Sequence, residues 1–259
     1  MLFCTGLIHS LRSHPFHAAT SFFCLFVLVD YSRTNMEVVT LQATTLPDAW
    51  FQALWHILKD GVPEYTIDLG SYAGQVRREF DYITIHIKYP GAQPLIPDMP
   101  PGIGIPSPTT QEYVDDYATR YLMTDSKQAN EQYTYGERLM VSMDKVIERY
   151  RTYGFGTNQL IMQVGQPSDI DLDDPPCLRH IDTRIRDNKL HFIIYFRSWD
   201  LWSGFPTNLA GFQQVKAYMA KEIGVEDGEM IVSSKGLHLY GYAKDLAKIR
   251  TGLKDYWKQ

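Results

Sequence analysis

The sequence is poor in cysteine, in long apolar runs and in excess charge of either sign. Three cysteines among 259 residues (Cys4, Cys24 and Cys177) are too few for a disulfide framework. No apolar stretch reaches 18 residues, so no membrane-spanning helix is predicted. The net charge of −5, from 25 Lys and Arg against 30 Asp and Glu, argues against a general nucleic-acid or anionic-membrane binder. A local anion pocket is compatible with this balance.

The remaining composition is that of a globular protein. Hydrophobic residues make up 44% of the chain and charged residues 21%, which excludes wholesale disorder. A length of 259 residues suits one large domain or two small ones.

The first 35 residues differ from the rest. Residues 21–29 read SFFCLFVLV, an apolar run that fits the core of a signal peptide, but no small-x-small cleavage site follows it. The alternative is an upstream extension, with the functional chain beginning at Met36, and we favour it. We therefore expect residues 1–35 to be a leader or a mis-assigned extension, poorly ordered, and residues 36–259 to form the functional domain. A cytoplasmic location follows if the chain begins at Met36.

The first half of the body alternates helices and irregular segments. Helical spacing predicts helices over 46–59, 110–122 and 135–150. Strict alternation predicts a half-buried strand over 79–89, with Phe80 on its more polar face. Seven prolines between residues 90 and 108 exclude a helix there. The acidic, proline-rich residues 165–176 are expected to form an exposed loop.

The second half predicts a sheet. Strands over 178–186 and 190–196 are joined at Asp187-Asn188, a pair that tolerates positive φ. A helix over 208–223 ends at Gly224, strands follow over 229–234 and 236–242, and a final helix begins near Ala243. The predicted fold class is α+β, a single domain with a mixed or antiparallel central sheet packed with helices.

Cys177 is a candidate nucleophile. It follows Pro175-Pro176 at the mouth of a strand, where rigid prolines hold the loop in place. Arg179 and Arg197 lie on the two strands of the hairpin, and nearby cations favour the nucleophilic thiolate. The alternative is a small buried hydrophobic residue.

A second concentration of polar residues spans 197–208. Arg197 and Ser198 together can hold a phosphate group. The amide of Asn208 offers a donor and an acceptor, so it can read a pyrimidine edge. The alternative is a polar turn with Trp199 and Trp202 as aromatic core anchors.

These motifs resemble thymidylate synthases in order and spacing. The resemblance covers residues 133–242, and the strings YTYGERL, GQPSD and YFRSWDLWSGFPTN look most like the compact archaeal-type branch of that family. The motifs are Pro175-Pro176-Cys177, Arg197-Ser198-x-Asp200, Gly204-x-Pro206-x-Asn208, His238-Leu239-Tyr240 and Tyr135-Gly136.

The resemblance implies a role for each matching residue. Cys177 would add to C6 of a pyrimidine nucleotide, and C5 would then attack the methylene group of 5,10-methylenetetrahydrofolate or a related methylene-pterin. Tyr135 would support the water network behind C5. The other matching residues would bind the substrate and the cofactor. Arg197 and Ser198 would hold the 5′-phosphate, and Asn208 would contact the base edge. His238 and Tyr240 would bind the sugar 3′-hydroxyl, and Asp200 and Gly204 would contact the pterin.

The sequence departs from the family pattern at several positions. Asn158-Gln159 stands where the family has paired arginines that a partner subunit contributes to the phosphate site. Arg77 or Arg78 could supply that charge, and we select Arg78. The acid/base glutamate has no clean counterpart; Asp116 lies closest, with Glu112 one turn earlier. The chain also ends soon after Tyr240, without the long C-terminal segment of typical members.

The resemblance implies a methyltransferase that makes dTMP from dUMP. The alternatives are a deoxycytidylate hydroxymethylase of the same fold, in which water takes the place of hydride, and a catalytically silent pyrimidine-nucleotide binding protein. Asn208 favours uracil, because a carboxylate would suit the donor pattern of cytosine better. The expected partner is a pyrimidine deoxynucleotide monophosphate, with no nucleic acid, membrane or metal, and both a monomer and a homodimer are compatible with the sequence.

Overall fold

A computed structural model of the protein describes residues 35–59, 62–102, 104–129 and 131–253. The expectation about residues 1–35 lies outside these ranges except for Asn35. The described elements belong to one compact unit that begins at Met36.

The main sheet has six strands in the order β1-β4-β9-β7-β6-β5. β1 pairs with β4, and β7 with β9, in parallel, whereas the other three pairs are antiparallel. The sheet is therefore mixed, as predicted. The strands are β1 (Val38–Ala43), β4 (Tyr82–Ile87), β5 (Ile161–Gln163), β6 (Leu178–Arg186), β7 (Lys189–Phe196) and β9 (Glu226–Ser234).

A smaller sheet positions much of the site. Its order is β2-β3-β10-β8, with β2 (Glu64–Thr66), β3 (Val76–Glu79), β10 (Leu237–Tyr240) and β8 (Trp199–Asp200). The antiparallel register of β3 and β10 sets Glu79 opposite His238 and Arg77 opposite Tyr240. The parallel pairing of β10 and β8 sets Asp200 opposite His238.

The helices begin and end at the signals their sequences carry. Thr45, Thr110 and Thr134 each accept an N–H of the first turn that follows. Gly224, with φ +88°, ends α4 as predicted. The helices are α1 (Leu46–Ile57), α2 (Gln111–Tyr117), α3 (Tyr135–Tyr153), α4 (Gly204–Ile223) and α5 (Gly241–Thr251), with a π-helical turn at Ala118–Leu122 and a 3₁₀ turn at Pro167–Asp171.

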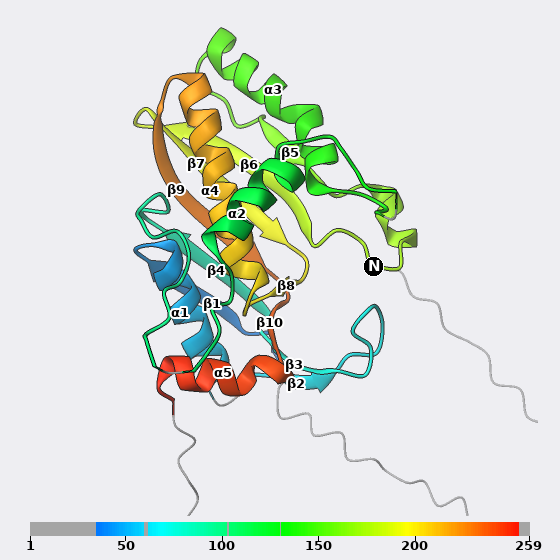
Figure 1. The fold of residues 1–259 in the computed structure, drawn as a ribbon. Helices are drawn as coiled ribbons and strands as arrows, with labels where there is room; N and C mark the ends of the chain where they lie inside the picture. The colour runs from blue at the N-terminus through cyan, green and yellow to red at the C-terminus, as the bar shows by residue number, and fades with distance from the viewer. Residues whose placement is uncertain (1–34, 60–61, 103, 130, 254–259) are drawn as a thin grey trace, which may run out of the picture. The chain divides into compact units, whose positions relative to one another are not determined.

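The core lies between the main sheet and its helices. α4 packs against the strands β7 and β9, and α2 packs against α4 (Figure 1). Burial alternates along β7, where every second side chain faces α4, so one face of the strand is apolar and covered. The buried side chains of this layer include Leu190, Phe192, Ile194 and Phe196 from β7 and Leu209, Phe212, Val215 and Met219 from α4.

Several predictions of local structure are confirmed. The alternating segment contains β4, with Ile83, Ile85 and Ile87 buried. Asp187 and Asn188 join β6 to β7 with φ values of 50° and 57°. Among the described residues, no helix is long and apolar enough to cross a membrane.

Other predictions are wrong in detail. The predicted strand 79–89 is two strands, because β3 ends at Glu79 and β4 begins at Tyr82. Phe80, between them, is buried rather than on a polar face. Residues 165–176 are not simply an exposed loop, because Asp169 is buried in a 3₁₀ turn. The helix predicted to begin at residue 208 begins at Gly204, where Asp200 caps it.

Candidate active site

A cavity of about 490 Å³ opens beside Cys177, within the size range of small-molecule sites. The residues that line it come from the smaller sheet, from the loop before β6 and from the segment directly after β7. Six residues selected from the sequence meet there: Cys177, Arg197, Ser198, Asp200, His238 and Tyr240.

The Cys177 thiol lies directly before β6 and is largely covered by its neighbours. Burial raises the pKa of Cys177, and the carboxylate of Asp174 raises it further. Arg197 and Arg179 act in the opposite direction, as expected from the sequence, but burial outweighs them. The cysteine is therefore a thiol at neutral pH.

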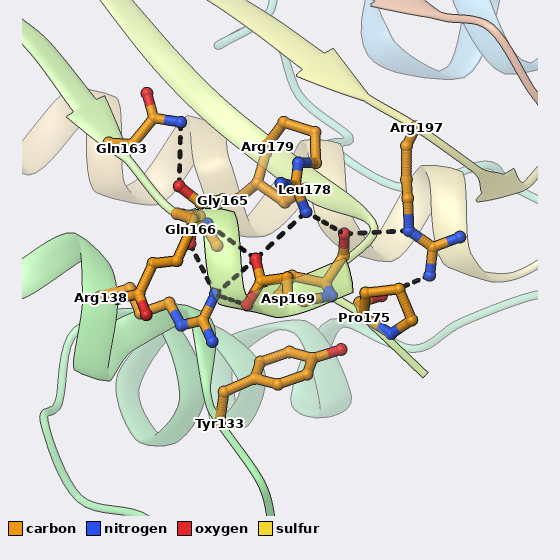
Figure 2. Close-up of polar contacts among 12 residues, drawn as sticks. Tyr133, Arg138, Gln163, Gly165, Gln166, Asp169, Pro175, Leu178, Arg179 and Arg197 are labelled. Carbon is orange, nitrogen blue, oxygen red and sulfur yellow. Dashed lines mark hydrogen bonds and ion pairs between the residues drawn. The ribbon is translucent and has the colours of Figure 1, made fainter. Parts of the chain in front are cut away.

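Two arginines hold the loop that carries Cys177. Arg197 donates from Nε to the carbonyl of Pro176 at 3.2 Å and from Nη2 to the carbonyl of Pro175. Arg179 donates to the same Pro176 carbonyl at 3.4 Å. Figure 2 shows both guanidinium groups directed at this segment. The backbone before the thiol is thus fixed from two sides.

Arg179 is itself held by a buried carboxylate. Asp169, with a side chain only 3% exposed, pairs with Arg179 at 3.2 Å and with Arg138 at 2.8 Å (Figure 2). Arg138 also donates to the carbonyl of Val164 at 2.8 Å. The guanidinium of Arg179 lies against Gly165, where a Cβ would stand 2.5 Å from it.

Sequence reasoning missed this network. Asp169 belongs to the GQPSD string, and Arg138 to YTYGERL, which were noted only as points of resemblance. The signal that could have indicated it is an aspartate beside Pro167 at the N-terminus of a turn, a position where a carboxylate accepts backbone N–H groups. Asp169 does so, accepting the N–H of Gln166 at 2.7 Å.

His238 lines the cavity and carries a buried ring nitrogen that has no hydrogen-bond partner among the described residues. Its ring is 3% exposed, and Nδ1 lies 2.9 Å from the carbonyl of Gly236, which can only accept. The proton therefore sits on Nδ1, and Nε2 is an acceptor with no hydrogen-bond partner among the described residues. Burial lowers the pKa of His238 to about 4, so the ring is neutral at pH 7.

Tyr240 lies beside His238 with its ring edge-on at 4.6 Å. On its other side it stacks on Tyr72, with ring centroids 4.7 Å apart. Both tyrosines line the cavity. A hydroxyl-bearing ligand would meet the acceptor of His238 and the phenol of Tyr240 together.

Arg77, not the selected Arg78, lies at the cavity. Arg77 pairs with Glu79 at 3.0 Å and contacts the hydroxyl of Tyr65. Arg78 instead points to the other side of β3, toward the carbonyls of Leu58, Lys59 and Val62. Alternation along a strand makes this unavoidable, because neighbouring residues face opposite sides. The sequence identified both arginines as candidates, but it does not show which of them faces the cavity, because that depends on how β3 is placed in its sheet.

Asp200 both lines the cavity and caps α4. Its Oδ2 accepts the N–H groups of Ser203 and Gly204 at 3.0 and 2.9 Å, and Oδ1 accepts that of Trp202 at 3.2 Å. Gly204 does not line the cavity, although its lack of a Cβ leaves room for Asp200 at 3.3 Å.

A second cavity, of about 420 Å³, holds three more of the selected residues. Asn208, Tyr135 and Asp116 line it together with Tyr117 and Tyr121. It adjoins the first cavity, because the Tyr135 hydroxyl accepts the N–H of Leu178, next to Cys177. Cys177 also raises the pKa of Tyr117, Tyr121 and Tyr135, after the larger effect of their burial.

Asp116 lies on the outer side of this second cavity. It pairs with Arg120 one turn later at 2.8 Å, and its side chain is 52% exposed. It does not line the Cys177 cavity, and Glu112 is exposed on the same helix. The structure therefore does not bring Asp116 to the thiol.

Within the described part of the chain, no cluster of three or more His, Cys, Asp and Glu residues could hold a metal ion. Asn158 and Gln159 are both exposed and do not line either cavity. The cations at the Cys177 cavity are Arg77 and Arg197, both from this chain.

A mixed sheet with a cysteine at the start of a central strand, flanked by the Arg-Ser and His-x-Tyr pairs, defines an α+β protein of the thymidylate synthase type. The sequence profile of the family described as "Thymidylate synthase" matches residues 115–255, more than half of the chain. The chain belongs to the thymidylate synthase family.

Relatives and a solved structure agree with this assignment. A protein of Methanosarcina barkeri named "Putative thymidylate synthase" is 28% identical over 216 residues, which cover 80% of this chain and 92% of the relative. One of Methanococcoides burtonii with the same name is 28% identical over 222 residues, covering 83% and 95%. The structure of thermostable thymidylate synthase A from Bacillus subtilis matches with a TM-score of 0.63 at 16% identity, over 81% of this chain and 84% of that one. At this identity the structural match concerns the fold alone, and it confirms the predicted fold class.

Proposed function

We propose that the protein transfers a one-carbon unit from a methylene-pterin to C5 of dUMP, with reduction, to give dTMP. The observation that carries the proposal is the convergence of Cys177 with Arg197, Ser198, His238 and Tyr240 around one cavity, in a member of the thymidylate synthase family. A binding protein needs no thiol beside the base, whereas this chemistry needs a nucleophile at C6.

The phosphate and sugar have complementary partners in the cavity. Arg197, Arg77 and Ser198 offer two cations and a hydroxyl to a 5′-phosphate. The unpartnered Nε2 of His238 accepts a hydrogen bond, so it suits a sugar hydroxyl that donates one. The Tyr240 hydroxyl adds a second partner at the same point.

The residues present also fit a pterin. Among the described residues, Oδ1 of Asp200 accepts one hydrogen bond, from the N–H of Trp202, so it retains acceptor capacity for a pterin N–H group. The exposed rings of Tyr72 and Tyr242, which line the same cavity, suit a flat heterocycle. When bound, the methylene-pterin supplies the one-carbon unit and the hydride. Methylenetetrahydrofolate is the carrier that the family typically uses, and this chain's own carrier is part of the proposal.

Cys177 does the covalent work. Its sulfur adds to C6 of the base, which makes C5 nucleophilic. C5 would then bond to the one-carbon unit and lose its own proton, and the bond between sulfur and C6 would break as the hydride reduces that unit. Because Cys177 is a thiol in the free protein, it must lose its proton as the substrate binds. Arg197, whose charge favours the thiolate, and the fixed carbonyls of Pro175 and Pro176 keep the sulfur in place for this step. Tyr135 holds the backbone of the next residue.

Two other functions fit parts of the site. A deoxycytidylate hydroxymethylase would use the same thiol addition and admit water in place of hydride. A silent nucleotide-binding protein would use the phosphate and sugar partners alone. A cytoplasmic location, and a monomer or homodimer as the working form, remain predictions of the sequence.

The deciding experiment measures tritium release from C5-labelled dUMP and dCMP in parallel, with methylenetetrahydrofolate. We expect release from dUMP together with dTMP. Release from dCMP with a hydroxymethylated product would replace the proposal by the hydroxymethylase. No release from either, with tight dUMP binding by calorimetry, would favour the binding protein.

The matched variant is Cys177→Ser. It should lose turnover by several orders of magnitude while keeping dUMP affinity, because the phosphate and sugar partners are untouched. Turnover that survives in this variant would refute the proposed role of the thiol.

A further inference from the structure

Two hydrogen bonds hold the Asn208 amide. Oδ1 accepts from Nε1 of Trp199 at 2.8 Å, and Nδ2 donates to the hydroxyl of Tyr117 at 2.8 Å. An indole N–H can only donate, so the amide oxygen must face Trp199. A phenol hydroxyl donates or accepts, so Tyr117 tolerates either orientation of the amide. Trp199 is therefore the partner that fixes which end of the amide is the donor.

The orientation of this amide bears directly on base choice. Uracil presents an acceptor at O4 and a donor at N3, whereas cytosine presents a donor at N4 and an acceptor at N3. If the two bases bind in the same pose, an amide that hydrogen-bonds to this edge must take one orientation for uracil and the opposite orientation for cytosine. After its contacts with Trp199 and Tyr117, Asn208 retains one lone pair on Oδ1 and one hydrogen on Nδ2 for such pairing.

Trp199 is rigidly placed. Its ring stacks on Phe196 at 3.9 Å with an angle of 7°, packs on Phe205 at 4.6 Å, and is 3% exposed. It also lines the Cys177 cavity, while Asn208 and Tyr117 line the adjoining one. Turning the amide over would set two donors against each other in a buried place, with no room for Trp199 to withdraw.

We propose that Trp199 is a positioning residue that sets pyrimidine discrimination by fixing the Asn208 amide. The inference rests on the proposed function, which supplies the nucleotide and the preference for uracil. Without the indole N–H the amide can adopt either orientation, and the site accepts the two bases on nearly equal terms.

The test is calorimetric titration of the full-length protein with dUMP and with dCMP, which requires no pterin. Trp199→Phe keeps an aromatic ring against Phe196 and Phe205 and removes the N–H. Tyr117→Phe is the matched control, because it removes the other hydrogen bond but leaves the orientation fixed. We expect the wild-type dUMP preference to fall about tenfold in Trp199→Phe, the effect of one such hydrogen bond. In Tyr117→Phe the preference should persist.

The outcomes separate the inference from the function on which it rests. An unchanged preference in Trp199→Phe would overturn the inference, as would an equal loss in Tyr117→Phe. A wild-type preference for dCMP that collapses in Trp199→Phe would support the role of Trp199 and overturn the assignment of uracil. A wild-type protein that binds neither nucleotide would overturn both.

A second measurement covers the case in which Trp199→Phe does not fold. The indole N–H resonance of Trp199 in the wild-type protein can be assigned by its shift in Asn208→Ala. We expect the slow exchange of this proton with solvent to persist when dUMP binds, because the hydrogen bond from Trp199 to Asn208 is kept in the complex. Rapid exchange in the dUMP complex would contradict the inference.

Discussion

The hydroxyl of Tyr135 accepts a hydrogen bond from the backbone N–H of Leu178 at 3.3 Å, in the buried region next to Cys177. Tyr135→Phe would leave this N–H without its partner, and Leu178 is fully buried. We expect the free energy of unfolding to fall by about 1–3 kcal/mol, the cost of an unsatisfied buried donor. Urea denaturation measures it.

Tyr121→Phe is the control for this prediction. Tyr121 lies edge-on to Tyr135 in the same cavity, and its hydroxyl has no hydrogen-bond partner within the described part of the chain. Its removal should change stability by less than about 0.5 kcal/mol. Equal losses of stability in the two variants would show that the hydrogen bond from Leu178 to the Tyr135 hydroxyl does not stabilise the fold.

The reactivity of Cys177 should depend on pH in a defined direction. Because burial raises its pKa, the thiolate fraction at pH 7 is smaller than for an exposed cysteine. Alkylation by iodoacetamide, followed by mass mapping of the Cys177 peptide, should therefore be slow at neutral pH and accelerate above pH 9. A fast reaction at pH 7 would contradict this.

Arg197 should shift the same profile. Its charge lowers the pKa of Cys177, so Arg197→Met should move the alkylation profile to higher pH. Arg184→Met, on the same hairpin but not lining the cavity, should leave it in place. An identical shift in both variants would indicate a general charge effect rather than a local one.

Loss of the Asp169 carboxylate should be strongly destabilising. Asp169→Asn removes one charge from a buried cluster with Arg138 and Arg179, and we expect a loss of about 3 kcal/mol. Asp171→Asn, two residues away and exposed, should cost almost nothing. Chemical denaturation of both variants provides the comparison.

The acid response of Asp169 has a definite sign. Burial alone would raise its pKa, but the Gln166 N–H and then Arg138 and Arg179 outweigh burial, and the net pKa is lowered. Its contribution is therefore present above pH 4 and is lost as the pH falls through the folded-state value. Wild-type stability should drop there more steeply than that of Asp169→Asn.

His238 should make stability depend on pH in a higher range. Its pKa is about 4 in the folded protein and about 6.5 unfolded, so the unfolded chain binds the extra proton first as the pH falls. The contribution of neutral His238 to the free energy of unfolding should be complete above pH 6.5. It should decline by up to about 3 kcal/mol between pH 6.5 and 4. His238→Asn should show a smaller decline in that interval, and an unchanged one would refute the assignment.

The sequence predicted what depends on local pattern. Alternation located β4, the Asp187-Asn188 turn located β6 and β7, and Gly224 located the end of α4, because these signals act within a few residues. The short strands β2 and β5 were missed, since three residues are too few for alternation to show.

For the candidate site, too, the sequence predicted what local pattern determines and missed what depends on contacts between distant segments. Motif spacing selected the six residues around the Cys177 cavity. The choice of Arg78 over Arg77 failed because it needs the register of β3 against β10. The burial of Asp169 was unpredictable because its two arginines come from α3 and β6, 31 and 10 residues away in sequence.

The bare backbone of Gly165 has an evolutionary consequence. A methyl group there would collide with the guanidinium of Arg179 at 2.5 Å, and Arg179 links Asp169 to the carbonyl before Cys177. Because ion pairing with Asp169 limits how far this guanidinium can move, we expect positions 165 and 179 to be epistatic. Alanine at 165 should be harmful beside arginine and tolerable beside a shorter residue, although a shorter residue at 179 gives up the link to Asp169. Among related sequences the two positions should change together, so that a residue with no side chain constrains which mutations the loop before Cys177 can accept.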